Sequence, residues 1–260
     1  MSGVPMPERQ GVSTPARVAT GAWRVWVLAA VPVAMCIAFA LGGPIAQDQA
    51  YHHFADGRMV FGIPNAWNVL SNLPFLLFGA WGLVALWRER DLGVPLRPLY
   101  VVFFAAAALV SVGSAYYHAD PDDATLVWDR LPMTLAFMAF FAAVVGRHVS
   151  PVFARHALVP LLLFGLSTVL WWRLQGDLRP YLLVQFVPVL AIPVVLLLFP
   201  RRTPGTRWIW WLLVAYVAAK VLETHDPQVH AAIGIGGHAL KHLAASSGVY
   251  CLLQALRAGW

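Results

Sequence analysis

Long apolar runs recur along the whole chain with only short polar links between them, and this pattern restricts the folds that are possible. Of the 260 residues, 60% are hydrophobic and 12% are charged, whereas a typical soluble protein has about 25% charged residues. A helix that crosses a bilayer needs about 20 mainly apolar residues. Membrane strands are disfavoured because the runs are continuously apolar rather than alternating. The sequence therefore predicts an all-α polytopic membrane bundle.

By this criterion we expect about eight transmembrane helices. Their approximate ranges are 23–41, 67–87, 98–117, 126–146, 156–172, 180–199, 208–222 and 238–256. The first run is longer than the ~7–15 apolar residues of a signal peptide, so we expect a retained helix rather than a cleaved leader. The predicted organisation is a disordered cytoplasmic tail (1–22), an additional N-terminal transmembrane helix (23–42) and a seven-helix domain (43–260).

Charged residues alternate between the two sides of the predicted bundle. The links on one side carry Arg9, Arg17, Arg24, Arg88, Arg90, Arg97, Arg147, Arg155, Arg201, Arg202, Arg207 and Arg257. The links on the other side carry Asp48, Asp56, Asp120, Asp122, Asp123, Glu223 and Asp226. Basic links face the cytoplasm, so both termini are expected there. The net charge of +6 follows from this rule and requires no nucleic-acid partner.

This topology brings four ionisable residues to one depth in the bilayer. His118 ends the third predicted span, Asp129 begins the fourth, and His238 and His242 begin the eighth. All four then lie near the non-cytoplasmic side, together with Asn68, Ser71, Asn72, Lys220 and Glu223. Ionisable groups inside a membrane are costly and commonly mark a functional site. The layer therefore predicts a site that opens to the non-cytoplasmic side.

Three histidines at one depth favour a zinc site. His238 and His242 are four residues apart and project from one helix face, and His118 would supply a third ligand from a neighbouring helix. Three protein ligands leave a fourth position for water, whose pKa falls to about 7 on zinc. Asp129 is the best-placed general base. Ser114, one turn before His118, would hold the water or a developing oxyanion.

Each of these residues also has a purely structural interpretation. An intramembrane histidine is often a hydrogen-bonded packing residue, and Asp129 would then pair with Arg130 or cap its helix. The Ser114 hydroxyl would bond back to a helix carbonyl. We expect the remaining histidines near the links to be solvated; these are His52, His53, His148, His156, His225 and His230.

Four sequence blocks resemble the alkaline ceramidases and, more broadly, the CREST superfamily, which also contains the adiponectin and progestin receptors. The blocks are Asn65-Ala66-Trp67-Asn68-Val69-Leu70-Ser71-Asn72-Leu73-Pro74-Phe75, Gly113-Ser114-Ala115-Tyr116-Tyr117-His118, Trp128-Asp129-Arg130-Leu131-Pro132-Met133 and His238-Ala239-Leu240-Lys241-His242-Leu243. They occur in the order typical of that family, and the resemblance covers roughly residues 48–253.

The resemblance implies a seven-helix bundle with an intramembrane zinc that hydrolyses the amide of ceramide. It implies His118, His238 and His242 as zinc ligands, Asp129 as the group that activates the water, and Ser114 as an assisting group. The helix at 23–41 is additional to the family pattern. The calcium site of alkaline ceramidases is not expected here, because the corresponding segment offers only Asp48, Asp56 and Asn65, and calcium prefers more oxygen ligands.

The leading functional hypothesis is a zinc-dependent amidase that acts on a ceramide-like lipid within the bilayer. The alternatives are a lipid receptor or sensor with a structural zinc, a lipid ester hydrolase, and a haem-binding electron carrier. The short links give a receptor little surface for a cytoplasmic partner and favour a bacterial inner membrane. No feature of the sequence specifies an oligomeric state.

Overall fold

The computed structural model describes residues 21–260, so almost all of the predicted tail, 1–22, lies outside the described residues. The described part is helical and contains no β-sheet. Its elements are α1 (Ala22–Leu41), the 3₁₀ helix η1 (Gln49–His52), α2 (Ala66–Leu70), α3 (Leu73–Arg88), α4 (Arg97–Ala119), α5 (Asp123–His148), α6 (Pro151–Gln175), α7 (Arg179–Leu198), α8 (Thr206–Thr224), α9 (Asp226–Ile233) and α10 (Gly237–Arg257).

The predicted all-α membrane bundle is confirmed, and each predicted span coincides with long helical structure. The span at 67–87 is divided into α2 and α3 by a turn at Ser71 and Asn72. By length and composition, six helices are able to cross a membrane: α1, α2–α3 together, α4, α5, α6 and α7. The short helices η1 and α9 were not predicted, because neither has the length or the periodicity that reveals a span.

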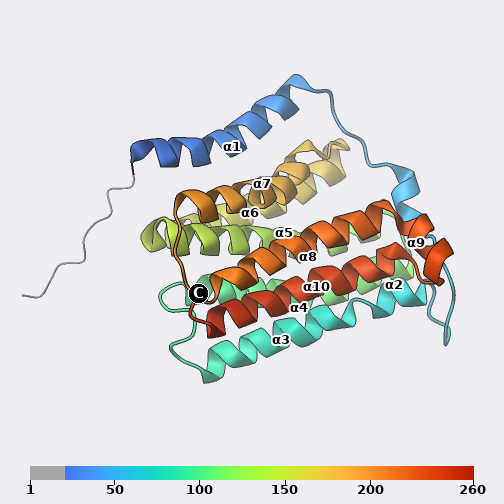
Figure 1. The fold of residues 1–260 in the computed structure, drawn as a ribbon. Helices are drawn as coiled ribbons and strands as arrows, with labels where there is room; N and C mark the ends of the chain where they lie inside the picture. Colours follow the sequence, from blue (N-terminus) through green and yellow to red (C-terminus); the bar gives the residue numbers. More distant parts are fainter. Residues whose placement is uncertain (1–20) are drawn as a thin grey trace, which may run out of the picture.

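The long helices of the bundle run side by side, and η1, α2 and α9 gather at one end (Figure 1). We call this the α9 end. Helix α1 buries none of its residues and packs chiefly against α7. Arg179 ties the two together by donating to the carbonyl oxygens of Phe39 (2.9 Å) and Gly42 (2.7 Å). Its hydrogen bonds to Asp177 lower the pKa of that carboxyl group to about 2.

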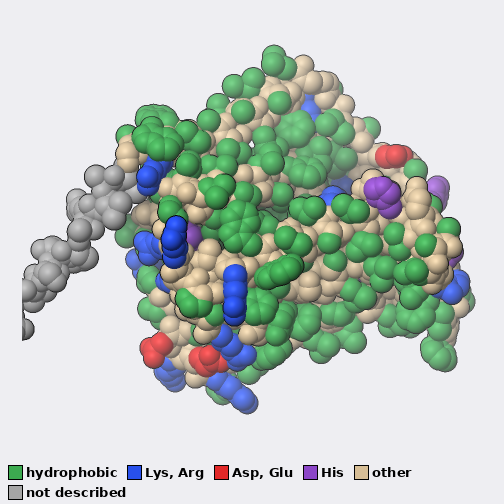
Figure 2. Space-filling model, viewed as in Figure 1, with side chains coloured by type: hydrophobic (Ala, Val, Ile, Leu, Met, Phe, Trp, Pro, Cys, Tyr) green, Lys and Arg blue, Asp and Glu red, His purple; other side chains and the backbone are tan. Residues whose placement is uncertain are grey.

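Hydrophobic side chains cover much of the flank of the bundle, as Figure 2 shows for one face. Lysine and arginine side chains gather at the end that holds the start of α1 and the C-terminus. Large apolar residues are exposed on several helices, for example Leu163 and Leu170 on α6 and Val217 on α8. Extended exposed apolar surface and six long apolar helices indicate an integral membrane protein.

Helices α4 and α5 approach each other closely at Gly113. A Cβ atom on Gly113 would lie 2.1 Å from the carbonyl oxygen of Trp128 and 3.4 Å from the backbone nitrogen of Asp129. Only glycine therefore allows this approach, which sets the spacing between Ser114 on α4 and Asp129 on α5.

The variant Gly113→Ala is expected to lower thermal stability, because the new methyl group forces the two helices apart. Overpacking of this kind costs about 1–3 kcal/mol. Thermal unfolding of the detergent-solubilised protein measures the effect. Gly43→Ala is the control, since a Cβ on Gly43 meets no atom within 4 Å. Equal unfolding temperatures for the two variants would contradict the proposed contact.

Candidate metal centre and adjoining cavity

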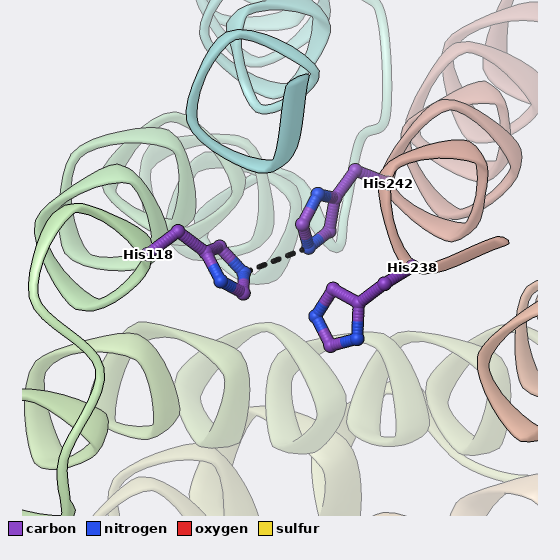
Figure 3. A group of neighbouring side chains, drawn as sticks. All are labelled: His118, His238 and His242. Atoms are coloured by element: carbon purple, nitrogen blue, oxygen red, sulfur yellow. Dashed lines mark hydrogen bonds between the residues drawn. The ribbon is translucent and has the colours of Figure 1, made fainter. Parts of the chain in front are cut away.

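Three histidine rings from two helices meet at the α9 end of the bundle. His118 comes from the last turn of α4, whereas His238 and His242 come from the first turns of α10 (Figure 3). Their candidate ligand nitrogens all lie within 4.8 Å of one another, and all three residues are buried. The Nε2 atoms of His118 and His242 are 3.1 Å apart. The three predicted metal residues are therefore assembled in one cluster that could hold a metal ion.

The hydrogen bonding of these rings fits a bound cation. Among the described residues, the buried His118 Nδ1 and His238 Nε2 atoms have no hydrogen-bond partner. A buried polar atom without a partner costs about 1–3 kcal/mol, and a metal ion bound to His238 Nε2 would remove that cost there. Zinc with nitrogen bonds of about 2.0–2.1 Å in tetrahedral geometry holds its nitrogens roughly 3.3 Å apart. The 3.1 Å between the Nε2 atoms of His118 and His242 is close to that spacing.

Ser71 and Asn65 contact two of the three histidines. Ser71, in the turn between α2 and α3, lies with its hydroxyl oxygen 2.8 Å from His242 Nδ1. This contact leaves His242 Nε2 to face the other two rings. The side-chain amide of Asn65 donates to the carbonyl oxygen of His118 at 2.9 Å. A ring partner such as Ser71 fixes the orientation and the tautomer of a histidine in metal sites.

Asp226 connects the beginning of α10 to the segment that precedes α2. Its Oδ1 accepts a hydrogen bond from the backbone N–H of His238, and its Oδ2 accepts one from Ala55, both at 2.9 Å. Gly237 is needed beside it, because a Cβ there would lie 2.3 Å from the carbonyl oxygen of Leu222. The positions of His238 and of the preceding segment are therefore set together.

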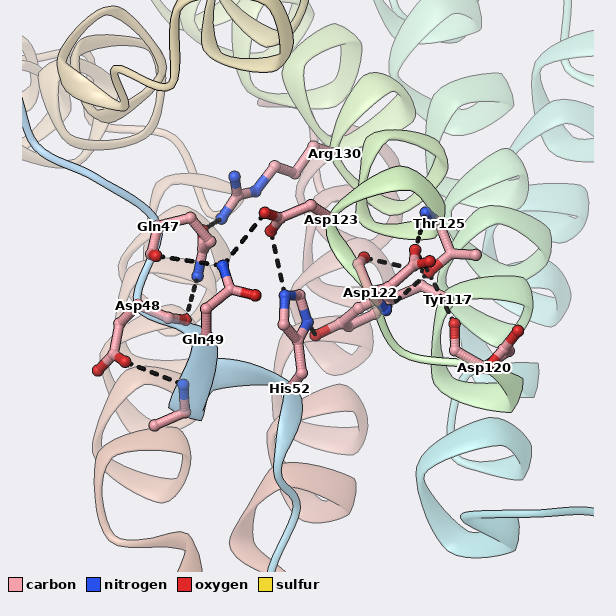
Figure 4. A network of polar contacts seen from close by, with 11 residues as sticks. Gln47, Asp48, Gln49, His52, Tyr117, Asp120, Asp122, Asp123, Thr125 and Arg130 are labelled. Atoms are coloured by element: carbon pink, nitrogen blue, oxygen red, sulfur yellow. Dashed lines mark hydrogen bonds and ion pairs between the residues drawn. The ribbon is translucent and has the colours of Figure 1, made fainter.

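Residues 46–54, which include η1, cross the α9 end of the bundle, and we call this segment the strap. Phe54 of the strap covers the cluster, with its ring centroid 4.8 Å from that of His118 and 4.5 Å from that of His238. His52 secures the strap through Tyr117 (3.0 Å) and Asp123 (3.1 Å), as Figure 4 shows. The strap therefore shields the histidines from solvent.

Asp129 and Ser114 are buried and line one cavity with His242. Asp129 lies well inside α5, whose N-cap is Asp122, so it does not cap the helix. No ion pair joins Asp129 to Arg130 among the described residues. Nor does the Ser114 hydroxyl bond to a carbonyl of α4 in the part of the chain that the structure describes, and it instead faces the Asp129 carboxyl group.

The cavity extends from this polar end into the interior of the bundle and has a volume of about 710 Å³. This is within the ~300–1,000 Å³ usual for small-molecule sites. Aromatic and aliphatic side chains from α3, α4, α5, α7, α8 and α10 line most of it; they include Phe103, Val110, Met133, Phe137, Phe140, Leu182, Phe186, Leu212 and Val249. A long apolar chain therefore fits its interior, and a polar group fits its histidine end.

Charged residues that sequence reasoning left without a role also line the polar end. Glu223 of α8 accepts hydrogen bonds from Lys220 and from Lys241, the latter at 2.5 Å. Tyr51 of the strap donates to the same carboxylate at 3.1 Å. Burial and the nearby Glu223 raise the pKa of Tyr51 well above its ordinary value, so it remains a neutral donor.

The acidic residues of the strap region have other partners. The Arg58 guanidinium donates two hydrogen bonds to Asp56, at 2.8 and 2.6 Å, and lowers the pKa of that carboxyl group. Asp48 caps η1 by accepting from the backbone of Ala50, whereas Asn65 donates to the carbonyl of His118. Asp48, Asp56 and Asn65, the three residues considered as possible calcium ligands, therefore each contact a different partner.

Two histidines that were expected to be solvated are not. His148 is 5% exposed, with Nδ1 2.8 Å from the carbonyl oxygen of Phe199 and Nε2 accepting from the Trp260 indole at 3.3 Å. The side chain of His52 is 8% exposed because the strap folds against α4 and α5. The prediction was wrong for both, since proximity to a link does not reveal what packs over it.

Comparison with known proteins supplies independent information. A protein-family model described as Ceramidase matches residues 60–201, which is more than half of the chain. The matched segment contains Ser114, His118 and Asp129, whereas His238 and His242 lie beyond it. A comparison with curated proteins found no match.

Proposed function

Since the chain belongs to the ceramidase family, which implies hydrolysis of ceramide, we propose that it cleaves the amide bond of a ceramide-like N-acyl lipid at a zinc ion. The products are a free fatty acid and a sphingoid-type amine. His118, His238 and His242 would hold the zinc, and Asp129 and Ser114 would act beside it.

One observation carries this proposal: the buried histidine cluster contacts a largely apolar cavity through His242. The cavity would take the acyl chain and bring its amide to the histidines, where Asp129 and Ser114 also line the wall. Three imidazoles with one open position are typical of catalytic zinc. A lipid-binding site without chemistry would have no need of a buried carboxylate beside them.

The chain's own residues account for the proton transfers. When bound, zinc would polarise the acyl carbonyl and lower the pKa of a water to about 7. Asp129 would take a proton as the water oxygen bonds to the acyl carbon. The Ser114 hydroxyl would donate to the developing oxyanion. Asp129 would then protonate the nitrogen as the carbon–nitrogen bond breaks, which releases the amine.

We further propose the arrangement of the chain in the membrane. The basic end of the bundle would face the cytoplasm, which puts both termini there and the metal centre near the opposite side. Residues 43–260 would form the family's seven-helix domain, and α1 would be an addition to it. The loose attachment of α1, which buries none of its residues and packs chiefly against α7, supports this division.

Two measurements on detergent-purified protein test the proposal. Elemental mass spectrometry should find about one zinc per chain. Hydrolysis assays should show amide cleavage of ceramide that exceeds cleavage of a matched ester. Faster ester cleavage would indicate a lipid ester hydrolase, and zinc with lipid binding but no turnover would indicate a receptor or sensor. Folded protein that never takes up metal would refute the zinc site.

Removing the Ser71 hydroxyl is expected to weaken the affinity for zinc by about 10–100-fold, as loss of an outer partner usually does. The variant is Ser71→Ala, and the affinity is measured by competition with a chelator of known strength. Ser247→Ala is the control, because this α10 serine bonds only to the carbonyl of Ala244. Equal zinc affinity in both variants would contradict the role of Ser71.

A further inference from the structure

Arg130 is a buried cation for which the described structure provides no anion. Its side chain projects from α5 into the polar end of the cavity, and the residue is only 6% exposed. No carboxylate forms an ion pair with it among the described residues. Its Nη1 atom is buried without any hydrogen-bond partner. A buried charge without a partner is strongly unfavourable, so this guanidinium requires an explanation.

The guanidinium is held in one orientation. It lies 4.1 Å from the ring centroid of Trp172 and 4.6 Å from that of Tyr181. Its Nη2 donates to the side-chain oxygen of Gln47, in the strap, at 2.6 Å (Figure 4). Stacking and one neutral acceptor orient the planar group without neutralising it. This leaves Nη1 available, and a guanidinium held in this way suits a carboxylate or phosphate.

The other charged side chains of the cavity form no ion pair with Arg130 among the described residues. The cationic side chains that line the cavity are Arg130, Lys220 and Lys241, and its carboxylates include the buried Asp129 and the partly buried Glu223. Asp48 also borders the cavity, but it is exposed and caps η1. The cavity lining therefore holds three cations and three carboxylates. Lys220 and Lys241 both pair with Glu223, and Arg130 is the cation that has no ion pair among the described residues.

We propose that Arg130 binds an anionic headgroup on the amine half of the N-acyl lipid, so that the preferred substrate carries a phosphate or carboxylate close to its amide. This inference rests on the proposed function. Arg130 follows Asp129 in the helix, and consecutive side chains point in different directions. A headgroup beneath the strap at Gln47 would thus lie beside the amide site, with the acyl chain in the apolar interior.

Two matched substrate pairs test the headgroup preference in the full-length, zinc-loaded protein. The first is ceramide 1-phosphate against ceramide with the same chains, and the second is N-palmitoylglycine against N-palmitoylethanolamine. In at least one pair, kcat/KM should be at least about tenfold higher for the anionic member. In Arg130→Gln that ratio should fall towards one, and Arg130→Lys should retain part of it.

Arg173→Gln is the matched control, because Arg173 is an exposed arginine near the same end of the bundle, and it should keep the wild-type ratio. A ratio near or below one in both pairs for the wild type would overturn the inference, as would an unchanged ratio in Arg130→Gln. If Arg130 served only to hold the strap, its loss would lower stability without changing the preference between substrates.

A binding measurement keeps the inference separate from the proposed function. Hexadecyl phosphate should raise the Tm of the detergent-solubilised protein more than hexadecanol does, and Arg130→Gln should lose that difference. This binding measurement tests the inference even if no N-acyl lipid is hydrolysed. Absence of hydrolysis would count against the proposed function, not against the anion site. Equal stabilisation by inorganic phosphate would indicate a site for a free anion and would overturn the headgroup assignment.

Discussion

Replacing His242 with alanine is expected to remove both the bound zinc and the hydrolysis of ceramide. His242 is the only one of the three histidines that also lines the cavity, and its loss leaves two imidazoles for the metal. Several kcal/mol of transition-state stabilisation depend on the metal, so kcat/KM should fall by more than about a thousandfold. Elemental mass spectrometry and the ceramide assay measure the two effects on the same preparation.

The His242→Ala experiment has a control within the chain. His156 is exposed on α6, and its Nδ1 lies 2.8 Å from the carbonyl oxygen of Val152 in the same helix. His156→Ala should therefore keep zinc and activity. His238→Ala should behave like His242→Ala, because both residues come from the same face of α10. Undiminished turnover in either of these two variants would disprove the metal-dependent mechanism.

Replacing Asp129 with asparagine is expected to abolish most turnover while it preserves much of the zinc. The three histidine ligands remain, but the amide cannot accept a proton from water or return it to the leaving amine. General acid–base catalysis contributes about 10²–10⁴-fold, and kcat should fall by that order. The difference between metal content and activity is what distinguishes this variant from His242→Ala.

Asp120→Asn is the control for the carboxylate, because Asp120 is exposed in the link between α4 and α5. It should retain wild-type activity and zinc. Loss of zinc in Asp129→Asn would instead make Asp129 part of the metal shell, and full activity would remove it from the mechanism. Circular dichroism of both variants ensures that an inactive protein is still folded.

Much of the fold was predictable because a bilayer imposes one simple rule on sequence. Each span must be long and apolar, and the eight predicted runs coincide with the long helices. The division between α2 and α3 was not predicted, because apolar length was the criterion and the run reads as one span, although Asn72 followed by Pro74 is a helix-start signal. Helix α9 escaped too, since a short helix at a membrane surface has no continuous apolar run.

The candidate site was predictable in part, for a related reason. Charge bias in the links predicted orientation, and orientation put His118, Asp129, His238 and His242 at one depth. The structure brings the three histidines together. It also removes the alternative contacts of Asp129, since Arg130 stacks on Trp172. The predicted depth of these residues could not indicate which of them meet, because depth does not specify the direction in which a side chain points from its helix.

By itself, the sequence determined that this protein is a helical membrane bundle with a polar layer near one end, because apolar length and charge bias are local properties. The tertiary structure alone decided which polar groups meet. Ser71 contacts His242 and the strap covers the histidines, although these residues are far apart in the sequence. It also decided that Arg130 is buried without an anion. Such facts depend on the rotation and packing of helices, which the free energy of the whole bundle sets.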